Sequence, residues 1–470
     1  MRFISFILLL VGFLLPPLKV NGQGRSSLLY SNFDGISGIF LNPSSGVDSR
    51  IYMDIQVVGA SFLGENNFFY IPKQDFRFTN LLFKPSALPR YGDHPFFAQG
   101  IPFKNYTGIK SPSLILDGSA TGPSILISTK KESIGFFTRL RVGASSNIPE
   151  PLLMFTLYGS SYEQTFKDID IFPAVKAGYM LWSETGVHYA RLLNPGYNNN
   201  WYLGGNLKVL SGYQAAHLSN DAIAYSRDTM DGLTVNSMNL NYAYAFGGSF
   251  LKPAGYGASM DIGLTFVKRG KTRATETYLK LSEQSSGDYQ YKAGISITDL
   301  GAIRFFRAAT GVRVQADHQV YLENWYKQVY TSLESVRIAL AEAVYDPANP
   351  DFKSRDRFSV PLAPIVSAQF DYHLFPRIFI NSSIDIPVIF SGQFIHQPLR
   401  VQICPRWESE KFGLWIPVSY NAVNGFHTGL AVRLAWLIIG TERLGNSLAY
   451  KDFTGTDLYI SIHIPLTKRK

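Results

Sequence analysis

A two-residue period of apolar and polar side chains is the feature that most constrains this chain. In residues 255–267 every second side chain is apolar, and those between are glycine or small and mainly polar. The apolar set is Tyr256, Ala258, Met260, Ile262, Leu264 and Phe266. Such alternation is typical of a β-strand, because successive side chains point to opposite faces. A face that is half glycine is typical of the inside of a barrel, where wall side chains compete for space.

The same alternation recurs along most of the chain. It is found in residues 133–143, 366–374, 414–420, 430–438 and 458–466. Tilted strands of roughly 9–11 residues are long enough to cross a membrane. We therefore predict an all-β fold, a transmembrane antiparallel β-barrel of about 14 strands, as in bacterial outer membranes. The alternative is a soluble β-sandwich, whose strands are usually shorter.

The composition favours the barrel. Charged residues make up 17% of the chain and aromatic residues 14%, which suits an apolar outer band with aromatic girdles. The net charge of +9 is scattered, apart from Lys468–Lys470, and no recognition motif accompanies it. We therefore expect no nucleic-acid partner. The single cysteine, Cys404, excludes an intramolecular disulfide.

The first 22 residues read as a secretory signal peptide. Arg2 precedes an apolar run over residues 3–15, and Val20-Asn21-Gly22 offers a cleavage site, so that the mature chain begins near Gln23. An uncleaved anchor helix is the alternative, but the run is shorter than the roughly 20 residues that a bilayer requires. We predict a hatch-like segment over 23–50 and the barrel over 51–470, located in the outer membrane of a Gram-negative envelope.

Two regions depart from the strand pattern. Residues 23–50 contain the Asn42-Pro43 turn and no spanning strand. Residues 321–345 predict an inserted amphipathic helix, because apolar side chains recur there at steps of three and four. The helix stripe is Trp325, Val329, Leu333, Val336, Leu340 and Val344. A lone helix must bury such a stripe, either as a cap on the barrel or against a partner protein.

The positions of the turns predict a topology. If the last strand ends in the periplasm, counting strands backwards places the turns at 421–425 and 250–255 on the periplasmic side. The same count places the loops at 269–288 and 440–455 outside and the helix at 321–345 in the periplasm. Short turns inside and long loops outside are usual for such barrels.

Several stretches together resemble a known family. They are LNPSSGVDSRIYMDIQVVGASF (41–62), GYGASMDIGLTF (255–266), YKAGISITDLGAIRF (291–305), CPRWESEKFGLWIPVSYN (404–421), GLAVRLAWLIIG (429–440) and DLYISIHIPL (457–466). In this order they resemble the Bacteroidota-type outer-membrane barrels of unknown function, which are similar to the FadL/TodX long-chain fatty-acid transporter class. In that class an N-terminal segment with an Asn-Pro turn lies inside the barrel as a hatch. The resemblance implies that Ser31–Ser45, with Asn42 and Pro43, has this place here.

The sequence offers no catalytic or metal-binding motif. Its eight histidines are dispersed without the spacing of metal ligands, and no Gly-x-Ser-x-Gly elbow is present. Asp168-Ile169-Asp170 reads as a solvated loop. We therefore predict that the protein is not an enzyme and has no cofactor and no metal.

The charged side chains on the predicted inner face are the remaining candidates. The lumen-lining set is Arg139, Arg141, Asp261, Lys292, Asp371, Asp385, Arg400, Arg406 and Arg433. These charges either pair across the lumen and fill it, or form a mildly cationic passage for anionic solutes. We predict FadL-like binding or passage of a small hydrophobic or anionic molecule. The alternative is a non-transporting scaffold that recruits envelope partners. Expected partners are outer-membrane lipid, such a ligand and a periplasmic protein.

Overall fold

The computed structural model describes the greater part of the chain. It covers residues 31–49, 51–76, 103–106, 108–109, 112–129, 131–148, 170–172, 175–195, 199–226, 232–269, 289–316, 320–323, 352–390, 392–447 and 451–467. The predicted signal peptide, residues 1–22, lies outside these residues and stays a prediction.

The strands form a closed antiparallel barrel with 14 wall strands, which confirms the predicted fold class. In order around the ring they are β1 (Ile51–Asn66), β4 (Leu114–Thr121) with β5 (Ser124–Ser128), β6 (Glu132–Ser146), β8 (Val175–Pro195), β9 (Asn199–Ser226), β11 (Gly255–Arg269), β12 (Tyr289–Phe305), β16 (Phe358–Pro361) with β17 (Ile365–Phe375), β18 (Ile378–Pro387), β19 (Arg400–Glu408), β20 (Phe412–Trp415) with β21 (Val418–Asn421), β22 (Gly425–Thr428) with β23 (Leu430–Leu434), β24 (Leu437–Thr441) and β25 (Gly455–Thr467). The ring closes where β25 pairs with β1, from Ile51 opposite Thr467 to Val58 opposite Ile462.

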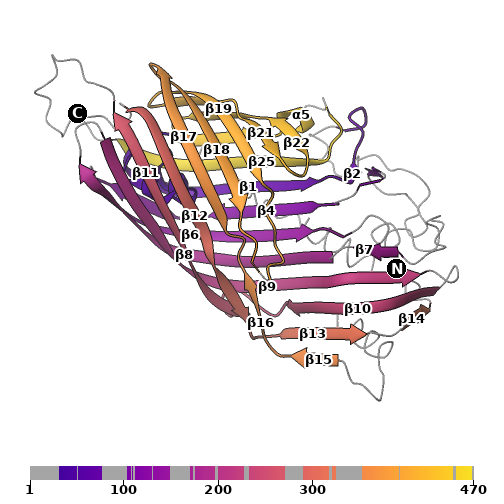
Figure 1. The fold of residues 1–470 in the computed structure, drawn as a ribbon. Helices are drawn as coiled ribbons and strands as arrows, with labels where there is room; N and C mark the ends of the chain where they lie inside the picture. The colour runs from indigo at the N-terminus through magenta and orange to yellow at the C-terminus, as the bar shows by residue number, and fades with distance from the viewer. Residues whose placement is uncertain are drawn as a thin grey trace, which may run out of the picture.

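A branch of the same sheet, which we call the side sheet, leaves the barrel from the far half of β9. Up to Gly212 this strand pairs with β11, and beyond Ala215 it pairs with β10 (Gly232–Ala245) instead. The side sheet continues through β13 (Ala309–Ala316), β14 (Val320–Glu323) and β15 (Phe352–Arg355), and β7 (Asp170–Phe172) pairs with its β9 edge. Figure 1 shows β10, β13 and β15 extending away from the steeply inclined strands of the barrel. The short strands β2 (Phe69–Tyr70) and β3 (Lys104–Asn105) form a separate pair.

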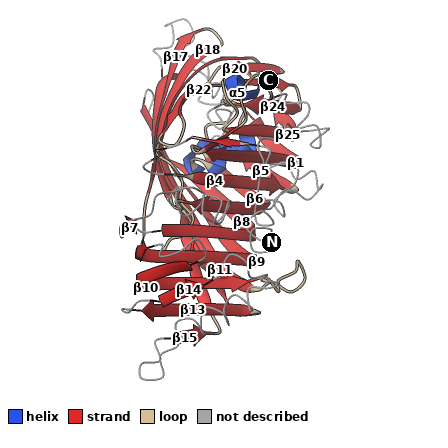
Figure 2. Cartoon of the chain, turned by 90° about the vertical axis from the view of Figure 1, so that its right-hand side faces the viewer, coloured by secondary structure: helices blue, strands red, loops and turns tan. Residues whose placement is uncertain are grey.

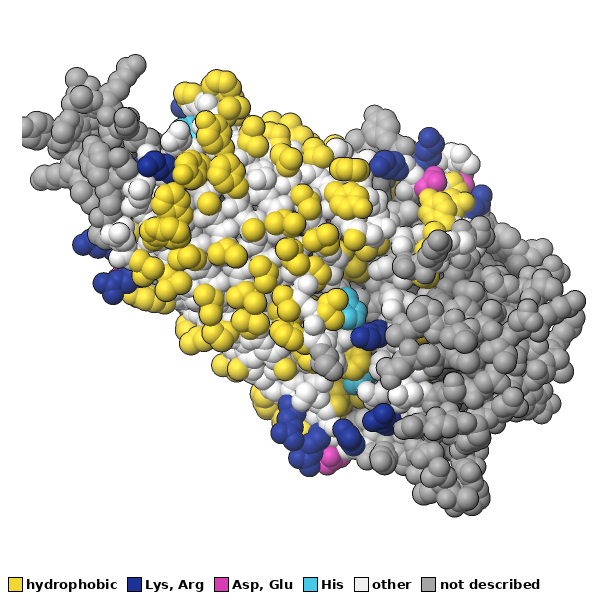
Figure 3. Space-filling view, viewed as in Figure 1, with side chains coloured by type: hydrophobic (Ala, Val, Ile, Leu, Met, Phe, Trp, Pro, Cys, Tyr) yellow, Lys and Arg dark blue, Asp and Glu magenta, His cyan; other side chains and the backbone are white. Residues whose placement is uncertain are grey.

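The predicted alternation of faces is confirmed in the wall. In β11, Ile262 is exposed on the outer face, whereas its neighbour Asp261 is buried on the inner face. In β25, Ile464 and Leu466 are exposed and His463 is buried. Outward apolar side chains form a broad band around the barrel, with basic side chains at its margins (Figure 3). Such a band is the surface that lipid covers in an outer-membrane barrel.

The two ends of the barrel differ in their connections. One end carries short turns at 376–377, 409–411 and 435–436, together with the paired residues Ile51 and Thr467. The other end carries the long connections at 67–113, 147–174 and 388–399 and the side sheet. We call these the short-turn end and the long-loop end. By the usual asymmetry of such barrels, the short-turn end faces the periplasm.

The topology predicted from the sequence is wrong at three connections. The turns at 421–425 and 250–255 lie at the long-loop end, and the connection at 269–288 begins and ends at the short-turn end. The cause is a tight turn at Ala435 and Trp436, which reverses the chain between β23 and β24. Ile438 therefore faces inward and is 8% exposed, although the predicted stripe placed it outside beside Trp436.

The predicted inserted helix also needs correction. Tyr321, Leu322 and Glu323 belong to strand β14, so no helix begins at Tyr321. Residues 324–345, with the whole apolar stripe, lie outside the described residues. Their connection leaves β12 and returns to β16 at the long-loop end, so it is not periplasmic as predicted. No helix among the described residues is long and apolar enough to cross a membrane.

The N-terminal segment, residues 31–49, lies inside the barrel. It contains two short 3-10 helices, η2 (Gly35–Phe40) and η3 (Pro43–Gly46), and nearly all of its residues are buried. Figure 2 shows these short helices enclosed by the ring of strands; the other helix, α5 (Leu444–Ser447), lies near β22 and β25.

Candidate functional site

Three glycines on neighbouring strands make room for the turn in the N-terminal segment. Gly204 on β9, Gly263 on β11 and Gly294 on β12 face the Asn42-Pro43 turn. A Cβ atom at Gly204 would lie 2.5 Å from the carbonyl carbon of Pro43, and one at Gly294 would lie 2.8 Å from Asn42 Nδ2. At Gly263 it would overlap Asn42 Oδ1. We call these three residues the glycine cradle, and Gly263 is its member on the inner face of β11.

Asn42 is the centre of the polar contacts at this cradle. Its side-chain Nδ2 donates to Thr265 Oγ1 over 3.1 Å and to Gln369 Oε1 over 3.0 Å. Its Oδ1 accepts from the Ser44 backbone N–H over 3.1 Å, which caps η3, and from Ser44 Oγ over 2.7 Å. The Ser44 hydroxyl lies 2.6 Å from Thr265 Oγ1. The turn is therefore bonded to β11 and β17 at once.

Side chains from other strands bond the backbone of the segment. Asn206 Nδ2 donates to the Ile39 carbonyl over 2.9 Å, and Ser296 Oγ donates to the Leu41 carbonyl over 2.7 Å. Asp54 Oδ2 accepts from the Ile36 N–H over 2.8 Å. These bonds satisfy polar groups of short helices that would otherwise be buried without a partner.

Apolar contacts hold the same segment against one side of the barrel. Ile36, Ile39 and Phe40 form a buried cluster with Leu126 and Phe137 of the wall. The rings of Phe40 and Phe137 meet edge to face at 5.0 Å between centroids. These contacts pack the segment against β5 and β6.

A layer of paired charges lies next to the segment on the long-loop side. Lys208 Nζ lies 2.7 Å from a carboxylate oxygen of Asp261 and 2.7 Å from one of Asp299. Arg141 Nη1 lies 2.9 Å from Glu184 and 2.9 Å from Asp299, while Arg139 lies 3.7 Å from Glu184. Three cations thus face three carboxylates, and this part of the lumen carries no excess positive charge.

Other predicted lumen residues bond the segment or one another near the short-turn end. Arg406 bonds both oxygens of Asp371 at 2.7 Å and Glu408 at 2.9 Å. Lys292 Nζ lies 2.5 Å from Asp48 and donates to Asn32 Oδ1 over 3.0 Å.

The last three predicted residues lie apart from these groups. Arg433 stacks over the Phe33 ring at 4.3 Å, Arg400 lies 2.7 Å from Glu442, and Asp385 accepts from Ser367 Oγ over 2.5 Å. The structure thus brings Arg139, Arg141 and Asp261 into one layer and Asp371 and Arg406 into another.

Sequence reasoning missed the main ionic partners Glu184, Lys208 and Asp299. Glu184 and Lys208 occupy the inward phase of the alternating strands β8 and β9, and that signal is present in the sequence. Asp299 sits at an irregularity in the pairing of β11 with β12, where it has a positive φ of 61°. The irregularity turns Asp299 inward next to Thr298, which also faces inward. Strict alternation could not have predicted that two consecutive side chains face the lumen.

Each of two buried histidines lies close to a serine hydroxyl and to a side-chain carboxylate or amide. His463 lies 3.0 Å from Asp54 and 2.6 Å from Ser461 Oγ. His188 lies 2.8 Å from Asn206 Oδ1 and 2.9 Å from Ser133 Oγ. Both groups are buried against the N-terminal segment, where they support it. No group of three or more potential metal ligands is found among the described residues.

An apolar layer covers the charges at the long-loop end. Its buried core includes Met180, Trp182, Leu210, Ile303, Phe305 and Leu362. The connection between β18 and β19 folds inward onto it, so that Ile395 joins the core and the Phe394 ring stacks on His217 at 3.6 Å. From the long-loop end to the short-turn end, the lumen is therefore filled first by the apolar layer, then by the layer of paired charges, and then by the N-terminal segment.

The family of unknown function DUF5723 matches residues 113–442. The chain belongs to this family. The family and the outer-membrane location predicted from the sequence are confirmed. No curated protein matches the sequence of this DUF5723 barrel.

Solved outer-membrane proteins are similar in structure to this DUF5723 barrel. A Pseudomonas aeruginosa FadL homologue is 9% identical, with a TM-score of 0.42 over 94% of this chain and 97% of its own. A TodX monoaromatic hydrocarbon channel mutant is 7% identical, with a TM-score of 0.43 over 93% and 95%. The Pseudomonas putida toluene transporter TodX is 7% identical, with a TM-score of 0.30 over 94% and 98%.

Proposed function

We propose that this protein is a gated outer-membrane barrel that binds a small apolar molecule and lets it pass when the N-terminal segment moves. The observation that carries the proposal is how this segment is held. No backbone–backbone hydrogen bond joins residues 34–46 to the described wall strands; side chains from separate strands hold them. Bonds of this kind can be exchanged for water, so the segment can leave while the ladder of the wall stays intact.

The distribution of charge favours an apolar cargo over an anionic one. In the layer of paired charges, each of Arg139, Arg141 and Lys208 has a carboxylate partner. An anionic solute would have to displace a buried carboxylate there. The apolar layer around Trp182 and Phe305 is packed and buried, so an apolar molecule that enters at the long-loop end would displace apolar side chains rather than charged ones.

A second function is supported by a different observation. The side sheet projects beyond the barrel and carries an edge strand, β15, which a protein partner can extend. A scaffold that recruits envelope partners would use this sheet and would need no movement of the N-terminal segment.

A disulfide between segment and wall tests the proposal. In a Cys404→Ser background, Ser44→Cys with Thr265→Cys puts two thiols where the hydroxyl oxygens lie 2.6 Å apart. Oxidation should reduce the uptake of labelled toluene, a small apolar probe, to the level of cells without the barrel. Reduction should restore uptake, because the gate is then free.

The matched control is a disulfide that does not involve the segment. Tyr244→Cys with Thr310→Cys joins register partners in the side sheet and should leave uptake unchanged in both redox states. Equal uptake by the oxidised and reduced Ser44–Thr265 variant would contradict the gate. Equal uptake with and without the barrel would contradict passage and favour the scaffold.

A further inference from the structure

A basic patch lies at the long-loop end, where the side sheet leaves the barrel wall. Its exposed side chains are Lys252, Arg304, Arg307, Arg313, Arg355 and Arg357. Among the described residues of these segments, Asp356 is the one exposed carboxylate. Strand pairing links the patch, since β12 with Arg304 pairs with β16 directly after Arg357, and Arg355 is the register partner of Gly311 on β13. Figure 3 shows basic side chains gathered around one acidic side chain below the apolar band.

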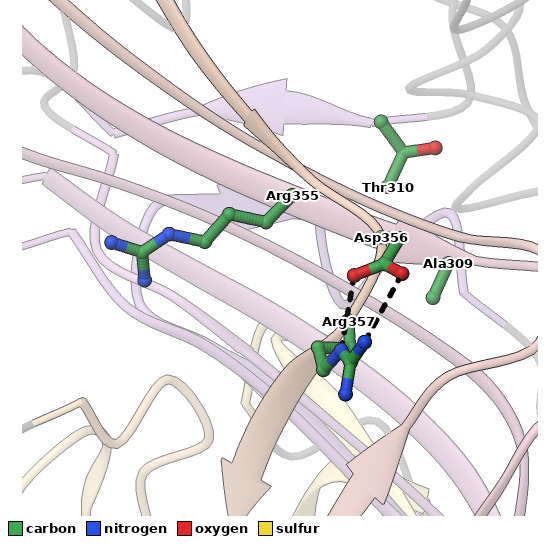
Figure 4. Close-up of a pocket in the computed structure, with 5 residues that line it drawn as sticks. All are labelled: Ala309, Thr310, Arg355, Asp356 and Arg357. Carbon is green, nitrogen blue, oxygen red and sulfur yellow. Dashed lines mark hydrogen bonds and ion pairs between the residues drawn. The ribbon is translucent and has the colours of Figure 1, made fainter.

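The carboxylate in this patch is already neutralised. Arg357 bonds both oxygens of Asp356, at 3.0 and 3.3 Å, and this pair keeps the pKa of Asp356 below its ordinary value. Arg355 points away from the pair (Figure 4). Together with Ala309 and Thr310, these three residues line an open cavity of about 720 Å³. No carboxylate of the described chain forms an ion pair with Arg304 or Arg355, so the patch has a surplus of positive charge.

The patch begins where the lipid-facing band ends. Tyr256 and Phe306 are exposed aromatic residues at this margin, with ring centroids 6.1 Å apart. Arg304 is the register partner of Tyr256 and shares its outward face. Aromatic girdles mark the boundary between hydrocarbon and headgroups, so the neighbouring guanidinium groups lie at the height of lipid phosphates.

The loop between β10 and β11 extends the same boundary. Phe250 is 72% exposed and Leu251 is 94% exposed, and Lys252 follows them directly. Two large apolar side chains that protrude fully beside a cation are costly in water but favourable in the headgroup region, where the apolar ends enter lipid and the ammonium stays outside.

We infer that this patch binds the phosphate of an anionic lipid headgroup in the outer leaflet. Arg304 and Arg355 supply guanidinium groups, whose planar donors match phosphate oxygens. Phe250 and Leu251 lie against the acyl chains beside that headgroup. The cavity at Arg355 has the size for a headgroup rather than for a lone ion. This site lies outside the lumen and does not depend on the proposed gate.

Lipid titration of the full-length barrel in neutral detergent, followed by native mass spectrometry, tests the inference. The probes are phosphatidylglycerol and phosphatidylcholine with identical acyl chains. The wild-type barrel should retain phosphatidylglycerol at least tenfold more tightly. Arg304→Gln with Arg355→Gln should lower that affinity roughly tenfold or more, because each cation near a lipid surface contributes to binding. Phosphatidylcholine binding should not change.

Two controls separate the headgroup site from general charge effects. Arg191→Gln removes a cation that is 63% exposed at the short-turn end of β8 and should leave lipid preference unchanged. Arg355→Lys should retain part of the preference for phosphatidylglycerol. Equal binding of the two lipids, or an equal loss in Arg191→Gln, would overturn the inference. Displacement of phosphatidylglycerol by low-millimolar inorganic phosphate would also overturn it, because the site would then recognise the free ion.

Discussion

Asn42 donates a hydrogen bond to Thr265 across 223 residues of chain, and this bond ties the N-terminal segment to the middle of a wall strand. Thr265 follows Gly263 on the inward face of β11, so the bond forms only because the glycine leaves room for the Asn42 amide. The space at Gly263 and the hydrogen bond to Thr265 together fix the position of the segment. Substitutions can change either of the two separately.

A side chain in the glycine cradle should weaken the binding of the N-terminal segment to the barrel wall. Gly263→Ala forces its Cβ into Asn42 Oδ1, and overpacking of this kind costs roughly 1–3 kcal/mol. The control is Gly205→Ala, whose Cβ would meet only the Asp261 carbonyl at an ordinary 3.4 Å. Denaturant unfolding of the purified barrel and its conductance in a planar bilayer check both variants. Equal stability and conductance for the two would show that the cradle does not position the segment.

Arginine at two heights on the outer face of β11 should have different effects. Ile262→Arg should cost roughly 2–4 kcal/mol if residue 262 lies near the bilayer midplane, and Tyr256→Arg should cost about 0–1 kcal/mol at the margin of the band. Titration of folding into lipid vesicles measures both. Equal costs at the two positions would place the hydrocarbon boundary elsewhere than at Tyr256 and Arg304.

Breaking the charged layer should destabilise the barrel strongly. Lys208→Met removes the cation from Asp261, whereas Asp299 keeps Arg141, and an uncompensated buried charge costs roughly 3–5 kcal/mol. Arg191→Met removes an exposed partner of Glu132 and should cost less than about 1 kcal/mol. Unfolding midpoints of the two variants give the comparison. A Lys208→Met barrel as stable as Arg191→Met would mean that the layer relaxes or hydrates.

The segment should be held more weakly at higher pH. Burial raises the pKa of Asp34 well above its ordinary value, with Lys292 acting in the opposite direction and Glu408 and Asp54 adding to the rise. A raised pKa favours the seated segment while Asp34 is protonated, so this contribution is full below the ordinary pKa and is lost as pH rises through the raised value.

Hydrogen exchange measures this dependence. After correction for intrinsic rates, protection of the amides in residues 35–46 should fall as pH rises through that window. Arg433 and His463 also face this region, so Asp34→Asn is the necessary control and should flatten the curve. An identical pH dependence in Asp34→Asn would assign the effect to another group.

The barrel could be predicted because its signal is repeated and local. The alternation alone assigns Ile262 to the outer face and Asp261 to the inner face of β11, and it does the same for the side chains of β25. The turn at Ala435 could not be predicted in this way. Ala435 has a φ of 54° without being glycine, and Trp436 and Ile438 continue the apolar pattern across the reversal. One missed turn reversed the predicted side of the connections before it.

The interior was predictable only in part. Inward charges such as Arg141 and Arg406 follow from strand phase, but their partners come from strands that are distant in sequence. Asp299 enters the layer through a bulge, and Asp48 reaches Lys292 from the segment inside the barrel. These pairings depend on ring order and on where the segment lies, which no local pattern encodes.

A measurement of how far the N-terminal segment moves during transport tests the central claim most directly. Spin labels at Ser45→Cys on the segment and Thr185→Cys on the outer face of β8, in a Cys404→Ser background, report their separation by double electron–electron resonance. With saturating toluene, a second population at longer distance should appear, and the disulfide between Ser44→Cys and Thr265→Cys should abolish it. An unchanged distance distribution under conditions in which the barrel takes up toluene would contradict the gate.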